Sequence, residues 1–132
     1  MTPGSRHIST RIDRLAAEVY SFASDPANLP AWASGLGSSV ELVNGRWTAE
    51  SPMGTVTIDF AAQNDLGVLD HDLTLPSGES VYNPMRVFAD GAGCEVVFTL
   101  RRRPEMTDEE FEGDATAVAA DLEKLRQVLE NR

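Results

Sequence analysis

The chain has 132 residues, a mass of 14.3 kDa and a formal net charge of −10. This length fits one domain, residues 1–132, and allows a core or a core that encloses a cavity. The negative charge would repel nucleic acids and anionic lipid heads, so we expect neither as a partner. The only cysteine, Cys94, cannot form a disulfide within the chain, and with two histidines it cannot complete a structural zinc site.

The sequence also lacks the patterns of membrane-spanning, secreted, phosphate-binding and metal-binding proteins. No stretch is long and apolar enough to span a bilayer, and the opening residues contain no apolar secretion core. Neither a glycine-rich phosphate loop nor a metal-ligand spacing is present. The sequence therefore predicts a cytoplasmic protein with no membrane insertion, no metal and no cofactor.

The first elements are predicted from changes in hydrophobic period. Alternation of Ile8, Thr10 and Ile12 with polar residues predicts a strand over Arg6–Ile12. Asp13 is a candidate N-cap for a helix that ends at Asp25-Pro26, because a residue before proline disfavours the helical conformation. Its apolar residues, at helical spacing, are Leu15, Val19, Phe22 and Ala23. A second short helical turn is expected over 28–33, with Trp32 as its buried anchor.

The segment from Ser38 to Arg103 has the period of an antiparallel meander with one wet face. Asn44-Gly45 is typical of a type I′ hairpin turn, because both residues tolerate positive φ. Six strands are predicted here, over 40–43, 46–49, 55–61, 68–75, 79–88 and 94–103.

The chain ends in a predicted long helix. Thr107 and Glu110 have the spacing of a capping box at its start. Apolar residues then recur at spacings of four and three, which places them on one face. They are Phe111, Ala115, Val118, Leu122, Leu125 and Leu129. This apolar stripe needs a partner, and the dry face of the meander is the surface available to it.

These residues resemble the START-like or SRPBCC superfamily, in particular its polyketide cyclase/dehydrase and lipid-transport branch. The similar stretches are Ile12–Phe22 with Asp25-Pro26, Leu29-Pro30 and Trp32, and the turn and strand over Gly91–Thr99. The resemblance implies an α+β helix-grip fold, in which a curved seven-stranded antiparallel sheet wraps around a long C-terminal helix, with two short helices after the first strand. It also implies a cavity, since members bind lipids, sterols, polyketides and other apolar molecules, and some catalyse cyclisation or hydrolysis.

A cavity is also plausible from the residues alone, because a curved sheet touches a straight helix over only part of its length. The first half of the terminal helix is rich in small residues, so we expect the void beside that half. These residues are Gly113, Ala115, Ala117, Ala119 and Ala120. The alternative is that the alanines favour helix and let the sheet approach closely.

Two polar residues are candidates for ligand contacts inside such a cavity. His71 falls on the dry face, where it could orient a carbonyl or act as an acid or base; the alternatives are a satisfied core histidine or a one-residue slip that exposes it. Asp70 and Asp72 fall on the wet face and should not reach His71. Asn83 also faces inward if its strand is regular.

Pro84 leaves the direction of Asn83 open. A proline often marks a bulge, and a bulge here would turn Tyr82, Arg86 and Phe88 inward in place of Asn83. An inward Arg86 would suit a ligand that bears a carboxylate.

The remaining candidates for the ligand-binding lining are apolar, and each one alone is more typical of ordinary core. They are Trp47, Phe60, Met85, Phe98 and Phe111 with Ala115, Val118 and Leu122. Trp32 is expected to seal a corner of the fold, although that corner could be a mouth. The run 101–103 of three arginines is interpreted as a solvated strand end, and Asp114 and Asp121 are too far apart along the helix to share a proton.

Three functions remain open. The favoured one is the binding or transport of a small apolar molecule by a monomer or homodimer. The second is a cyclase, dehydrase or hydrolase, in which His71 and either Asn83 or Arg86 converge on a bound carbonyl. The third is a protein-interaction module without a small ligand.

Overall fold

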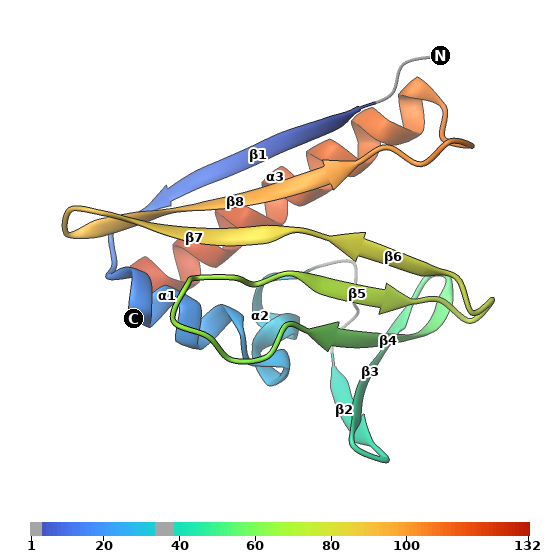
Figure 1. Cartoon of the computed structure of the whole chain (residues 1–132), viewed down its shortest axis with the longest axis horizontal. Coiled ribbons are helices and arrows are strands. Elements are labelled where there is room, and N and C mark those ends of the chain that lie inside the picture. The colour runs from blue at the N-terminus through green and yellow to red at the C-terminus, as the bar shows by residue number, and fades with distance from the viewer. Residues whose placement is uncertain (1–3, 34–38) are drawn as a thin grey trace.

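The computed structural model describes residues 4–33 and 39–132, which form an α+β structure (Figure 1). Ser38, where the predicted meander begins, lies outside the described residues. The elements follow in the order β1 (Ser5–Ile12), α1 (Ala16–Ala23), the short helical turn η1 (Pro26–Asn28), α2 (Leu29–Trp32), β2 (Val40–Val43), β3 (Arg46–Ser51), β4 (Gly54–Phe60), β5 (His71–Thr74), β6 (Ser80–Asn83), β7 (Met85–Asp90), β8 (Gly93–Arg101) and α3 (Asp108–Glu130).

Both short helices form after β1, but the predicted N-cap is wrong. Leu15 occupies the N-cap of α1, and no side chain caps this helix. Asp13 instead donates its backbone N–H to Glu130 Oε2, at 2.9 Å, which ties the start of α1 to the end of α3. The carboxylate of Asp25 does cap, since it accepts the N–H of Ala27 at 3.0 Å and so begins η1.

The strands form two antiparallel sheets, whereas the expectation was one sheet of seven strands. The first has the order β1-β8-β7 and the second the order β2-β3-β4-β5-β6. The two sheets are joined where the segment before β5 runs beside β7: Leu69 N–H donates to Met85 O at 2.8 Å, and Val87 N–H donates to Gly67 O at 2.9 Å. The β2–β3 turn is as predicted, with φ of 51° at Asn44 and 80° at Gly45.

Pro84 is the reason for the additional strand. The predicted strand over 79–88 is divided there into β6, which pairs with β5, and β7, which pairs with β8. Proline has no N–H to donate to a ladder, so the chain changes partners at this point. The carbonyl of Pro84 still accepts a hydrogen bond from Thr99 N–H at 2.9 Å, which connects the break to β8.

The break at Pro84 does not exchange the two faces of the chain. Asn83 and Met85 are both buried, at 8% and 1% exposure, whereas Tyr82 and Phe88 on the other face are 42% and 53% exposed. The alternation that a regular strand predicts is therefore kept across the proline, and Asn83 faces inward.

The terminal helix has the predicted cap and the predicted apolar stripe. Thr107 Oγ1 accepts the N–H of Glu110 at 3.0 Å, and Glu110 Oε1 accepts the N–H of Thr107 at 2.9 Å. This reciprocal pair satisfies two N–H groups that a helix start otherwise leaves unpaired. α3 packs against β1 and β8, as Figure 1 shows.

Two groups of buried side chains cover the stripe of α3. Leu122, Leu125 and Leu129 belong to the larger group, which includes residues of α1, α2 and the strands. Phe111 and Ala115 belong to a smaller group with Leu100 and Met106. Val118 lies between them and is partly buried against both groups. The helix is thus anchored at both ends, and the gap in its packing lies near the middle.

Candidate functional site

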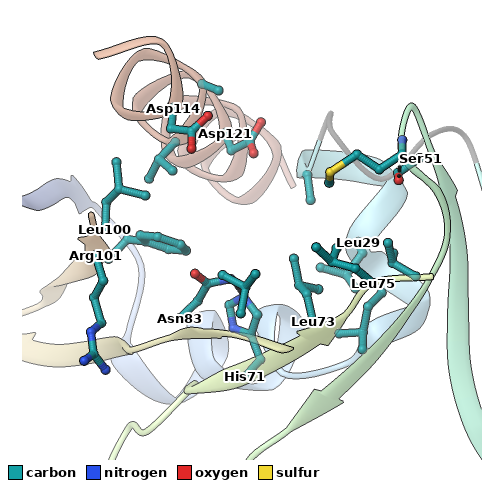
Figure 2. A pocket seen from close by; sticks show the side chains of 18 of the residues that line it. Leu29, Ser51, His71, Leu73, Leu75, Asn83, Leu100, Arg101, Asp114 and Asp121 are labelled. Carbon is teal, nitrogen blue, oxygen red and sulfur yellow. Dashed lines mark hydrogen bonds between the residues drawn. The ribbon is translucent and has the colours of Figure 1, made fainter. Parts of the chain in front are cut away.

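A pocket with a volume of about 300 Å³ lies between the sheet and the middle of α3. Figure 2 shows α3 on one side of this space and the strands on the other. Most of its wall is aliphatic or aromatic. The apolar lining consists of Leu29, Trp32 and Ala33 near α2, Met53, Val56, Ile58, Leu73, Leu75, Val81, Phe98, Leu100 and Met106 from the strands and loops, and Ala117, Val118 and Leu122 from α3.

Strand alternation explains why this wall is apolar. Ile58 pairs with Leu73, and Leu73 pairs with Val81, so three neighbouring strands present aliphatic side chains at one level of the inner face. In α3, Ala117 and Val118 project too little to fill the space opposite them. Ala117 and Met53 line the pocket and are also exposed, so the pocket opens to solvent beside them.

The pocket is lined by α3 residues between 114 and 122, which overlaps the predicted small-residue stretch, but most of the small residues themselves do not line it. Ala117 lines it, but Ala115 is buried with Phe111 in the smaller core group. Gly113, Ala119 and Ala120 are exposed and do not line it. A small residue leaves a void only where it also faces the sheet, and the helical period decides which ones do.

His71 and Asn83 form the polar part of the floor. They are directly opposite each other on β5 and β6. His71 Nδ1 lies 3.0 Å from the carbonyl oxygen of Leu69, and Asn83 Nδ2 lies 3.4 Å from His71 Nε2. The imidazole is also flanked by Phe60 and Phe98, with ring centroids 5.0 Å and 6.1 Å away.

These contacts define the protonation state of His71. A carbonyl oxygen can only accept, so Nδ1 carries the hydrogen and donates it to Leu69. Burial among aromatic rings lowers the pKa of His71 below its ordinary value, against weaker opposing effects of the Leu69 hydrogen bond and of Asp70 and Asp72. The ring is therefore neutral near pH 7, with an unprotonated Nε2 that accepts the Asn83 amide hydrogen.

Trp32 lines the pocket, but its one polar side-chain atom is buried and has no partner. Its side chain lines the pocket and is only 5% exposed. Among the described residues, one buried side-chain nitrogen or oxygen has no hydrogen-bond partner, and this atom is the indole Nε1 of Trp32. The sequence pattern places Trp32 at a corner or mouth of the fold, but it does not indicate a buried donor without a partner.

Charged residues lie at the rim of the pocket, including two that sequence analysis had discounted. Asp114 and Asp121 line it from α3, and Figure 2 shows both carboxylates on the pocket side of the helix. Arg101 and Arg103 also line it, but the guanidinium of Arg101 points away from the space and lies 6.0 Å from the ring centre of Tyr82. Arg102 pairs with Asp108 at 2.6 Å, away from the pocket.

The opposite face of the same strands carries a second polar cluster, around Asp70. Asp70 lies on that face, as predicted, but it is buried rather than wet. Its carboxylate accepts hydrogen bonds from Tyr82 Oη at 2.5 Å, Met85 N–H at 2.8 Å and Arg86 Nη2 at 3.1 Å. The hydrogen bond to this carboxylate raises the pKa of Tyr82. The cluster connects β5, β6 and β7 at the break between the sheets.

The structure brings five of the ten predicted lining residues to the pocket. They are His71, Asn83, Phe98, Val118 and Leu122. The other five lie elsewhere: Phe60 and Met85 pack within the larger core group, Phe111 and Ala115 within the smaller one, and Trp47 is half-buried on β3. Period-two counting assigned the correct face to these strand residues but could not tell how far along the strand the space extends.

The described residues provide neither a metal site nor a membrane-spanning helix. Residues 4–33 and 39–132 contain no group of three or more histidine, cysteine, aspartate or glutamate side chains arranged to hold a metal ion. Within those ranges, the helices are too short or too polar to cross a membrane.

Solved structures share this fold at low sequence identity. A conserved protein from Geobacillus kaustophilus aligns with a TM-score of 0.77 and 13% identity, over 97% of this chain and 96% of that one. XoxI from Bacillus cereus aligns with a TM-score of 0.72 and 16% identity, over 95% of this chain and 94% of XoxI. DynU16, from the dynemicin biosynthetic locus, aligns with a TM-score of 0.69 and 12% identity. The alignment covers 96% of this chain and 47% of DynU16.

The sequence itself identifies the family. No curated protein matches the chain. The family model for polyketide cyclase / dehydrase and lipid transport, however, matches residues 6–130. This range includes the whole of α3 and all the strands, except for the first residue of β1. Together with the helix-grip arrangement of sheet and helix, this match shows that the chain belongs to the polyketide cyclase / dehydrase and lipid transport family.

Proposed function

We propose that this protein binds a small, largely apolar molecule in the pocket between the sheet and α3. The observation that carries the proposal is the pocket itself, about 300 Å³ with an aliphatic and aromatic wall and two convergent polar side chains, His71 and Asn83. Small-molecule sites typically combine such walls with a few polar groups that fix orientation. The volume is at the lower end of the usual range, which favours a compact ring system over a long lipid chain.

The test is a neutral fluorescent probe with a blocking variant and a matched control. Ala117 lines the pocket at its opening, whereas Ala119 lies on the same helix, is also exposed and does not line it. We expect N-phenylnaphthylamine to bind saturably to the wild-type protein. Ala117→Trp should weaken binding about tenfold by occupying the opening, and Ala119→Trp should leave it unchanged.

A second measurement locates the probe without a variant. Methyl signals of Leu73 and Val118, which line the pocket, should shift in NMR spectra as the probe is added. The methyls of Leu125, which is fully buried in the core and does not line the pocket, should not. Equal shifts at both places, or no saturable binding, would refute the proposal.

A second candidate function is catalysis in the same pocket, of the cyclase or dehydrase type. The observation that favours it is the unprotonated Nε2 of His71, a general base beside an apolar space. To act, Nε2 would have to exchange its 3.4 Å contact with Asn83 for a substrate C–H. The test uses benzoylacetone in heavy water, where deuterium from the solvent replaces the protons on the carbon between the two carbonyls. The wild-type protein should accelerate this exchange, and the His71→Gln variant should not.

A further inference from the structure

The free edge of β1 is a surface that the pocket does not use. β1 is the outermost strand of the sheet β1-β8-β7, as Figure 1 shows, and the described residues that line the pocket include none from β1. We propose that this edge binds the same edge of a second copy of the chain, so that two antiparallel β1 strands join two sheets into one continuous sheet. The inference is independent of the proposed function.

The hydrogen bonds of β8 define which backbone groups of β1 face outward. Arg102 N–H donates to Gly4 O at 3.0 Å, and Thr99 N–H donates to Pro84 O at 2.9 Å, so β8 alternates between its two neighbours. Hydrogen-bonded and non-hydrogen-bonded residue pairs alternate in an antiparallel ladder. The even-numbered residues of β1 therefore bond to β8, and the odd-numbered ones present N–H and C=O groups to the free edge. These outward residues are Ser5, His7, Ser9 and Arg11.

The outward backbone groups of β1 have no partner within residues 4–33 and 39–132. β1 pairs with β8 one-to-one over its eight residues, so it contains no bulge, and its sequence contains no proline. β2, at the edge of the other sheet, has only four residues. Long, regular edges are templates for pairing with another chain, and proteins usually shorten or interrupt them. The β1 edge is therefore the one suited to pairing.

The charged side chains of β1 are held against their own chain and do not guard the edge. Arg6 Nη1 donates to Glu112 Oε2 at 2.8 Å, and Arg11 is paired with Asp90. His7 Nδ1 lies 2.9 Å from a threonine hydroxyl of β8. A charged side chain that protrudes over an edge repels a second strand, but a neutralised and anchored one does so much less. A second β1 can therefore approach.

The sequence of β1 is self-complementary in one antiparallel register. A two-fold axis relates identical surfaces, so the two copies of β1 pair antiparallel. With the axis at Ile8, every outward residue meets another outward residue: Ser5 faces Arg11 of the second copy, and His7 faces Ser9 of the second copy. The junction then has four residue pairs with two hydrogen bonds each.

The side chains agree with this register. At the axis Ile8 meets its own counterpart, and Arg6 faces Thr10 of the second copy, so no like charges are directly opposite. Moving the axis by one residue in either direction leaves one outward residue of each strand without an opposite one. In one direction it also places Arg11 opposite His7, and like charges in that position are destabilising. The register centred on Ile8 is therefore favoured.

The test compares two substitutions of Ser9, whose N–H would donate to His7 of the second copy. Ser9→Pro removes this N–H, and the monomer tolerates a proline there because the N–H faces solvent. Ser9→Ala keeps the N–H and is the matched control. Circular dichroism checks that each variant folds.

Analytical ultracentrifugation at physiological ionic strength, which screens the net charge of −10, measures the association. The wild-type mass should rise with protein concentration from 14.3 kDa toward twice that value. Ser9→Pro should weaken dimerisation at least about tenfold, because each dimer loses two hydrogen bonds. Ser9→Ala should change it less than about twofold.

A spin label measures the register without a proline. Ser5→Cys provides the attachment site, and Cys94, at 0% exposure, stays unlabelled. In the proposed dimer the two labelled positions are six residues apart along the junction, so electron–electron distance measurements should give about 20 Å. Moving the axis by one residue would give about 14 Å or about 27 Å.

Three results would overturn the inference. One is a wild-type chain that remains at 14.3 kDa at millimolar concentration. Another is a dimer that Ser9→Pro leaves as strong as the wild type, because it uses a different surface. The third is a distance between Ser5 labels that does not match about 20 Å. If Ser9→Pro does not fold, the mass and the label distance decide the question. None of these results affects the proposed function, whose tests use residues outside β1.

Discussion

The two faces of strands β5 and β6 carry two polar clusters that differ in one respect. On the outer face, Asp70 accepts three hydrogen bonds at 2.5–3.1 Å, from Tyr82, Met85 and Arg86. On the inner face, one residue further along each strand, His71 and Asn83 share a single contact of 3.4 Å beside the pocket. The outer cluster is saturated with partners, whereas the inner cluster retains capacity for another molecule.

This difference indicates which cluster holds the fold together and which one is available for binding. A carboxylate with three donors in a poorly solvated place stabilises what it connects, and here it connects the ends of two sheets at Pro84. A long hydrogen bond at the wall of an apolar pocket contributes little to stability. Asp70 in the outer cluster thus stabilises the fold, whereas His71 and Asn83 in the inner cluster are available for binding. Substitutions can distinguish these two roles.

The largest expected effect is the loss of the outer cluster. Asp70→Ala should lower the free energy of unfolding by about 3 kcal/mol, because it leaves Met85 N–H unpaired and removes the ion-pair partner of Arg86. Urea denaturation followed by circular dichroism measures this change.

Asp72→Ala is the matched control. Asp72 lies on the same face and is exposed, and its replacement should change stability by no more than about 0.5 kcal/mol. If the two alanine variants are equally stable, Asp70 does not hold the junction and the comparison of the two faces loses its basis.

On the inner face, the corresponding substitution should cost little stability. Asn83→Leu removes one long hydrogen bond and adds apolar surface to a mostly apolar wall, so the free energy of unfolding should change by no more than about 1 kcal/mol. The same denaturation experiment checks it against Asp70→Ala. A loss as large as that of Asp70→Ala would mean that Asn83 is part of the framework rather than part of the site.

Much of the fold follows from local patterns that tertiary contacts do not override. The capping box at Thr107, the Asn44-Gly45 turn and the stripe of α3 each depend on neighbours in the sequence, and the structure confirms all three. The prediction of Asp13 as N-cap is wrong because α1 begins only at Ala16, with Leu15 at the N-cap. Asp13 instead makes tertiary and local contacts: its N–H donates to Glu130, and its carboxylate lies 3.4 Å from Arg11 Nε. The eighth strand appeared because Pro84 changes the strand's partner without changing its faces.

The site was less predictable for a different physical reason. Alternation assigns a side chain to a face, and it correctly turned His71 and Asn83 inward. The limits of a cavity, however, depend on which large side chains meet across the gap, and no short pattern encodes that meeting. Met85 and Phe60 therefore proved to be packed in the core, whereas Asp114 and Trp32, which were assigned other roles, line the pocket.

A smaller effect concerns the pH dependence that the inner cluster should confer. Burial lowers the pKa of His71 in the folded protein, so between that pKa and about 6.5, the ordinary value, the unfolded chain binds more protons. Stability should therefore fall as the pH is lowered through about 6.5. His71→Gln should flatten this part of the profile, as measured by urea unfolding at closely spaced pH values. An unchanged slope would contradict the buried, neutral imidazole.

The finest distinction between the two faces is the titration of Tyr82. Its phenol donates to the Asp70 carboxylate, and ionisation would both break that hydrogen bond and place two negative charges together, which is why its pKa is raised. In Asp70→Asn the pKa of Tyr82 should fall back toward about 10, since an uncharged amide cannot repel the phenolate. NMR of the ring carbon bonded to oxygen follows each tyrosine separately during the titration. Asn83→Leu should leave this titration unchanged, because the side chain of Asn83 lies on the other face of the strand. A shift of the Tyr82 pKa in that variant would show that the two clusters communicate through the strands.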